Sequence, residues 1–178
     1  DASIYHECTH LSFHSAAVTS ISTCVQRPIV ATTSADMTLR LYDYEQKCTV
    51  LVKTLDDEVL SSALHPTGLF ITIGFRFYTR VYALLQGDAH LLEDINVKPA
   101  YELRYSNGGG RLAIAVNNRV LIYDAHSFNF IGTLVGHLSP VKSIHFSPTD
   151  DRVTTCDVGG MTFVWSSATL KRESNMES

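Results

Sequence analysis

The chain has 178 residues, of which 45% are apolar and 18% are charged. These proportions predict a folded domain with a sizeable core and exclude a disordered chain. The formal net charge of −4, with no run of lysine or arginine, argues against nucleic acid and anionic membranes as partners.

Cysteine spacing and hydropathy indicate the compartment. The four cysteines form no CxxC pair and are typical of buried thiols in a reducing compartment: Cys8, Cys24, Cys48 and Cys156. No stretch approaches the roughly 18 apolar residues of a membrane span, and no signal-peptide pattern precedes the first strand. We therefore expect a protein of the cytoplasm or cytoskeleton. Because the chain starts at Asp1, we also expect an excised segment of a longer protein.

Two sequence landmarks recur with a period of about 41 residues. The first landmark stands at 18–21 (VTSI), 59–62 (VLSS), 100–103 (AYEL) and 141–144 (VKSI). The second, an apolar residue followed by an aromatic one, stands at 41–42, 81–82, 122–123 and 164–165. A period of 40–45 residues with several short strands per unit is typical of β-propeller blades.

Each unit alternates apolar and polar residues as strands do. In the first unit, runs rich in Val, Ile, Thr and Tyr stand at 18–24, 29–34, 38–42 and 47–52. Turn-forming residues separate them, and similar turns recur at 65–68, 107–110 and 147–151. The prediction is an all-β propeller segment of about four blades, each a four-stranded antiparallel sheet. The repeats span 1–43, 44–84, 85–125 and 126–166 within a domain of residues 1–170, and 171–178 form a polar tail or linker. Residues 1–13 would supply the outer strand of a preceding blade.

Several landmarks resemble the WD-repeat (WD40) family. Gly136-His137, the run 141–148 and Trp165 match the family's Gly-His, first-strand and tryptophan positions. In the first blade, the matching positions of the buried histidine, hydroxyl, aspartate and aromatic residue are His14, Thr32, Asp36 and Tyr42. The resemblance implies a hydrogen-bonded network with a structural role, to which His137 and Trp165 would contribute in the last blade.

The other blades depart from this family pattern. The position of Asp36 is occupied by Arg76, Asn117 and Gly159. We therefore expect only the first network to be complete, with apolar packing holding the remaining blades.

Longer strings are similar to the WD-repeat cilia- and flagella-associated proteins. They include residues 27–32 (RPIVAT), 63–68 (ALHPTG) and 105–109 (YSNGG). This resemblance implies a non-catalytic scaffold of the ciliary or flagellar axoneme that helps to hold inner dynein arms, with protein partners and no cofactor. The alternative is a general cytosolic WD adaptor, for example in RNA processing or ubiquitin-ligase substrate binding.

Two patterns raise the question of catalysis. Residues 6–10 (HECTH) match the HExxH zinc-protease motif, which requires a helix to place both histidines on one face. The repeat register places His6 and His10 on a strand, and no third ligand is evident, so a zinc enzyme remains a distant alternative. The grouping of His14, Thr32 and Asp36 contains the residue types of a hydrolase triad, but no GxSxG motif accompanies it. We therefore predict no enzyme, no metal site and no catalytic residue.

One segment departs from the small turns of the other blades. Phe75-Arg76-Phe77-Tyr78 stands between the second and third strands of the second unit. Because interface anchors favour Tyr, Trp and Arg, these four are candidate protein-contact residues, although Phe77 could pack inward instead. Four repeats should not close a ring, and we expect the chain either to self-associate through its exposed first and last blades or to be part of a larger assembly.

Overall fold

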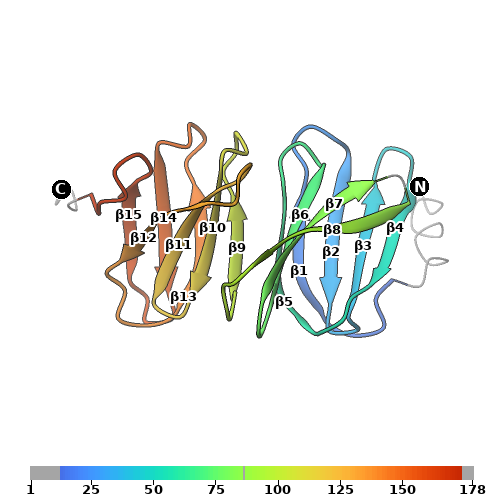
Figure 1. The fold of residues 1–178 in the computed structure, drawn as a ribbon, viewed down its shortest axis with the longest axis horizontal. Coiled ribbons are helices and arrows are strands. Elements are labelled where there is room, and N and C mark those ends of the chain that lie inside the picture. Colours follow the sequence, from blue (N-terminus) through green and yellow to red (C-terminus); the bar gives the residue numbers. More distant parts are fainter. Residues whose placement is uncertain (1–12, 86, 174–178) are drawn as a thin grey trace, which may run out of the picture.

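The computed structural model describes residues 13–85 and 87–173, and every helix or strand within these ranges is a β-strand. The strands form four sheets that follow one another along the chain (Figure 1). The first sheet contains β1 (Val18–Thr23), β2 (Ile29–Ser34), β3 (Thr38–Asp43) and β4 (Cys48–Thr54). The second contains β5 (Val59–Leu64), β6 (Phe70–Phe75), β7 (Thr79–Leu85) and β8 (Asp88–Ile95). The third contains β9 (Glu102–Tyr105), β10 (Arg111–Val116), β11 (Arg119–Asp124) and β12 (Phe130–Val135), and the fourth β13 (Val141–Phe146), β14 (Arg152–Asp157) and β15 (Thr162–Ser166).

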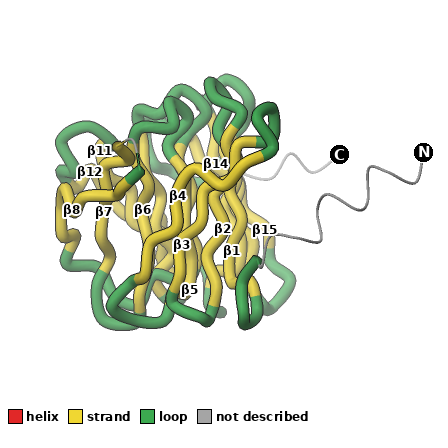
Figure 2. Tube along the Cα trace, turned by 90° about the vertical axis from the view of Figure 1, so that its right-hand side faces the viewer, coloured by secondary structure: helices red, strands yellow, loops and turns green. Residues whose placement is uncertain are grey.

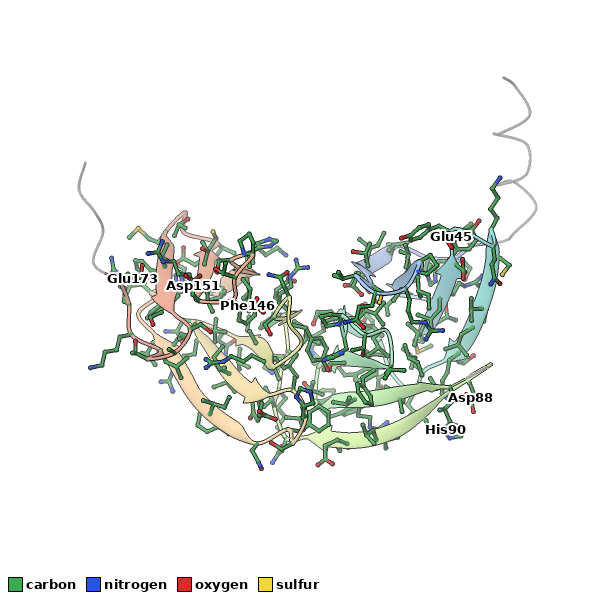
Figure 3. All side chains as sticks on the ribbon, turned by 90° about the horizontal axis from the view of Figure 1, so that it is seen from above. Glu45, Asp88, His90, Phe146, Asp151 and Glu173 are labelled. Atoms are coloured by element: carbon green, nitrogen blue, oxygen red, sulfur yellow. The ribbon has the colours of Figure 1, made fainter. Side chains whose placement is uncertain are left out.

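Each sheet is an antiparallel meander in which neighbours in sequence are neighbours in space. Seen from above, the four sheets stand around an open arc (Figure 3). The predicted all-β propeller segment is therefore confirmed. The sheets are offset from the sequence repeats, because the outer strand of each complete blade comes from the start of the next repeat.

Both sequence landmarks coincide with irregularities in strand pairing. The register shifts within β1, β5 and β13 directly after Val18, Val59 and Val141, which are members of the first landmark. It shifts again between the apolar and aromatic residues of the second landmark in β3, β7 and β11. A bulge bends the strand and increases its local twist. The 41-residue period therefore corresponds to bulges, and hence bends, that recur at equivalent positions in successive blades.

The core consists of three apolar layers, one between each pair of adjacent sheets. Leu39 and Leu41 of the first sheet pack against Ile71 and Ile73 of the second. The second layer joins the second and third sheets through Val81, Leu103, Leu112 and others. The third joins the third and fourth sheets through Ile122, Ile144, Trp165 and others. The inner strands β6 and β10 are buried along most of their length because both faces of their sheets are covered.

Turns at one end of the sheets repeat a left-handed backbone position. Gly68, Gly109 and Asp150 have φ values of 70°, 73° and 59° and follow each other at intervals of 41 residues. The turn before each outer strand also contains one residue with a positive φ: Lys47, Gly87, Phe128 and Leu170. Lys, Phe and Leu are unfavourable in this conformation, so the repeated blade geometry imposes it.

The fourth sheet begins a further strand after β15. Arg172 pairs with Trp165, and the Ser166 and Glu173 amides donate to the Lys171 and Val164 carbonyls. Residues 171–173, the first residues of the predicted tail, therefore pair with β15. The rest of that tail lies outside the described residues, as do residues 1–12 of the outer strand expected for residues 1–13.

Burial of the cysteines differs from the expectation. Cys24 is buried, but Cys48 is exposed and Cys156 is half-buried, because they alternate to other faces of their strands. Cys8 lies outside the described residues. Within 13–85 and 87–173, no helix is long and apolar enough to cross a membrane.

Candidate interaction surface and buried polar networks

His14 is the centre of a polar network in the first blade. Its ring Nδ1 lies 3.2 Å from both carboxylate oxygens of Asp36, and its Nε2 lies 2.9 Å from the Thr32 hydroxyl. The Thr38 hydroxyl donates to Asp36 at 2.6 Å, and the Ser15 amide donates to it at 2.9 Å. Burial alone would raise the pKa of Asp36, but the hydrogen bonds from Thr38, Ser15 and His14 hold it well below its ordinary value.

Tyr42 does not join this network. Among residues 13–85 and 87–173, no hydrogen bond links Tyr42 to Thr32, and its ring instead lies 6.2 Å from that of Phe13. The assignment of Tyr42 to the hydrogen-bonded network is therefore wrong in this structure. Thr38 occupies the polar position instead, since its hydroxyl reaches both His14 and Asp36.

The last blade contains a second network, contrary to the expectation that only the first would be complete. Trp165 Nε1 donates to the Thr155 hydroxyl at 2.8 Å, and that hydroxyl lies 2.7 Å from His137 Nε2. The Nδ1 atom of His137 lies 2.8 Å from Asp157. With the proton of a neutral imidazole on Nδ1, every donor in this series meets one acceptor.

The position-by-position comparison missed Asp157. It assigned the aspartate's place to Gly159 in the turn, whereas the carboxylate comes from the last residue of β14. Burial raises the pKa of Asp157, but hydrogen bonds from His137 and the Met161 amide lower it below its ordinary value. Asp157 stands two residues before Gly159 in the sequence and pairs with His137. A search for aspartate within two residues of the aligned position would have found it.

The middle blades carry isoleucine at the hydroxyl position. The strand register aligns Thr32 and Thr155 with Ile73 and Ile114, and both isoleucines are fully buried. As expected, these blades are held by apolar packing at this point.

Neither network offers an open catalytic site. The His14 and His137 side chains are 2% and 1% exposed, so the rings have no free edge toward a substrate. Thr155 is fully buried, and its hydroxyl already has two partners. Buried polar groups paired in this way stabilise one register of the chain.

The HECTH pattern, considered above only as a distant alternative, belongs to the N-terminal segment before Phe13. His6 and His10 lie outside the described residues. Across the described ranges, no group of three or more histidine, cysteine, aspartate or glutamate side chains could hold a metal ion.

The candidate contact segment divides into buried and exposed residues. Phe75 is fully buried at the end of β6, and Tyr78 is half-buried with its ring 4.6 Å from that of Phe75. Arg76 is exposed, and Phe77 is 66% exposed. Phe75 is therefore a core residue and unavailable to a partner, while Phe77 points to solvent because Phe75 fills the inner position.

Phe77 and Arg76 border a groove formed by three connections between strands. The groove has a volume of about 470 Å³ and is lined by Asp57, Glu58, Leu60, Arg76, Phe77, Pro99 and Tyr101. In an antiparallel meander, the β4–β5, β6–β7 and β8–β9 connections all stand at one end of the sheets. Figure 2 shows the loops gathered at the two ends of the strands. Sequence reasoning found the β6–β7 part of this groove and missed the other two parts.

Comparison with known proteins identifies the repeats. A family model described as "WD domain, G-beta repeat" matches residues 6–43 and 128–166, the ranges that include the two polar networks. The mouse (Mus musculus) protein named Cilia- and flagella-associated protein 57 is 31% identical over 160 residues, which cover 90% of this chain and 13% of that protein. Cilia- and flagella-associated protein 57 C of Tetrahymena thermophila is 30% identical over 173 residues, which cover 88% of this chain and 13% of that protein.

A further relative has a different name. The 77 kDa echinoderm microtubule-associated protein of Strongylocentrotus purpuratus is 24% identical over 143 residues, covering 77% of this chain and 21% of that protein. The chain thus spans only about an eighth of the length of the ciliary relatives. These relatives confirm the resemblance of the quoted strings to the cilia- and flagella-associated proteins. The chain is therefore a WD-repeat protein, similar over most of its length to Cilia- and flagella-associated protein 57.

Proposed function

We propose that the chain is a non-catalytic protein-interaction scaffold of the ciliary or flagellar axoneme. The observation that carries the proposal is the 31% identity to mouse Cilia- and flagella-associated protein 57 across 90% of the chain. The histidine networks support a structural role because their polar atoms are buried and mutually paired. The exposed residues of the groove support contact with other proteins.

Within the axoneme, the proposed role is to help hold inner dynein arms on the doublet microtubule. Partners would be dynein-arm or doublet-associated proteins. The relative named as a microtubule-associated protein supports attachment to such a filament. Rigid sheets with interaction sites on their loops suit a part that must keep a fixed spacing under load.

Localisation tests this proposal. A fluorescently tagged form of the protein, expressed in a flagellated cell, should remain along the axoneme after detergent extraction, because it is bound to the filament. The tag alone is the control and should be extracted completely. If detergent extracts the tagged protein as completely as the tag alone, and no flagellar signal remains, the axonemal proposal fails. The alternative function, a general cytosolic WD adaptor, would then be favoured.

A further inference from the structure

The groove at the β4–β5 end of the sheets presents two exposed aromatic side chains. Phe77 is 66% exposed and Tyr101 is 48% exposed, and they come from different connections. Half-buried Leu60 and Pro99 add apolar surface to the same groove. Aromatic side chains around an apolar depression are the usual anchors of a protein interface.

A rigid acidic wall borders the aromatic part of the groove. The Tyr78 hydroxyl donates to Asp57 at 2.7 Å, and burial together with this bond raises the pKa of Tyr78. The Arg80 guanidinium lies 4.3 Å from the centre of the Tyr78 ring and donates to Asp56 at 2.7 Å. These contacts join the β4–β5 connection to Tyr78 and Arg80, and any ordering they provide lowers the entropic cost of binding.

The charges of the groove are unequal. Asp57 and Glu58 contribute two carboxylates, and Arg76 contributes the one guanidinium among the lining residues. Asp56 is already paired with Arg80. The excess negative charge favours a cationic group on the partner and disfavours an acidic one.

We propose that this groove binds an extended segment of a partner protein in which an apolar or aromatic side chain stands beside lysine or arginine. The apolar side chain would lie between Phe77 and Tyr101, and the cation would face Asp57 and Glu58. This inference rests on the proposed interaction role and names the chemistry of the partner.

Peptide binding tests the proposal directly. Three fluorescein-labelled peptides of equal length serve as probes: Lys-Leu-Lys-Phe-Lys-Leu, Glu-Leu-Glu-Phe-Glu-Leu and Lys-Ser-Lys-Ser-Lys-Ser. Fluorescence anisotropy with the purified protein should show the first peptide binding at least about tenfold more tightly than either of the others, since only it offers both cation and apolar anchor. Equal binding of the acidic peptide, or of the serine peptide, would overturn the proposal.

Matched variants locate the binding site. Phe77→Ser and Glu58→Lys should each weaken the first peptide by about tenfold, as expected for loss of an interface anchor. The controls are Phe130→Ser on β12, where Phe130 is 56% exposed, and Glu45→Lys in the β3–β4 turn, which the antiparallel meander places at the opposite end of the sheets. Both controls should bind the peptide as the unmodified protein does. If Phe130→Ser weakens binding as much as Phe77→Ser, the binding is nonspecific and the proposal falls.

The outcomes separate this proposal from the axonemal one. Tyr101→Ser removes the second aromatic anchor and should weaken binding of the first peptide as Phe77→Ser does. If the purified protein does not bind the first peptide selectively but the tagged protein stays on the axoneme, only the groove proposal is refuted. Specific peptide binding by a protein that is absent from the axoneme would refute only the ciliary role.

Discussion

Single residues decide which blades are held by polar contacts and which by apolar ones. Thr155 illustrates the difference because its hydroxyl joins Trp165 to His137 in a site with no access to water. The aligned residues Ile73 and Ile114 fill the same space without hydrogen bonds. A blade can use either solution, but a blade with half of a network would leave a polar atom buried and unpaired.

Thr155→Val should therefore destabilise the protein even though it preserves volume. The indole N–H of Trp165 would lose its acceptor and His137 its partner, which should lower the free energy of unfolding by about 1–3 kcal/mol. Urea denaturation followed by tryptophan fluorescence measures the change. Thr154→Val is the matched control, because its side chain lies on the opposite face of the same strand, and it should have little effect. Equal stability of the two variants would contradict a structural role for the network.

At the scale of elements, the turns link successive blades. The thiol of Cys24 donates to the Pro66 carbonyl at 3.0 Å, and His65 Nε2 lies 2.9 Å from the Gly109 carbonyl. Asp150 accepts from the Asn107 and Gly108 amides at 2.8 and 2.6 Å. Each turn thus contacts the corresponding turn of the next blade. Burial, as the main cause, lowers the pKa of His65 below its ordinary value, which suits a neutral ring that donates to a carbonyl.

Gly109→Ala should disrupt one of these links. A Cβ at Gly109 would stand 2.5 Å from His65 Nε2, and its φ of 73° disfavours any other residue. Overpacking and backbone strain together should cost about 2–5 kcal/mol in the free energy of unfolding.

Gly110→Ala is the matched control for this turn. A Cβ at Gly110 meets no atom within 4 Å. Gly110→Ala should therefore change the free energy of unfolding by no more than about 0.5 kcal/mol. Thermal and urea denaturation compare the two variants. The predicted link would be refuted if both changed stability alike.

At the scale of the whole molecule, the first sheet has exposed apolar residues on a face that no other sheet within 13–85 and 87–173 covers. Ile21 is 66% exposed, although Leu103 and Ile144 at the same register in later blades are 2% and 0% exposed. Val18 is 55% exposed, whereas Val141 is 2% exposed. In the other blades a neighbouring sheet covers these positions, so this face is suited to bind another sheet.

We predict that the purified 178-residue chain self-associates through this face. Light scattering should give a mass that exceeds the monomer and rises with concentration, because burial of the apolar face drives association. Ile21→Glu should return the chain to a monomer. Leu91→Glu, on the outer strand β8 where Leu91 is 53% exposed, should leave association unchanged. A monodisperse monomer of the unmodified chain would contradict the prediction.

The sequence by itself determined the period, the strand content and the blade order, because alternation and turn residues depend on contacts within one blade. Its two landmarks also marked the positions where the strands bulge. The resemblance to WD repeats and to the ciliary proteins could be read from strings such as residues 63–68, since those residues stand in sequence together.

The tertiary structure alone decided how residues distant in sequence meet. It placed Asp157 rather than the aligned turn residue beside His137, and it separated buried Phe75 from exposed Phe77. It also joined three connections into one groove, two of which carried no signal in the sequence. Strand pairing specifies the face of the sheet on which a residue lies. Packing between sheets determines which buried polar atoms meet a hydrogen-bond partner, and the spacing of residues along the sequence does not specify these contacts.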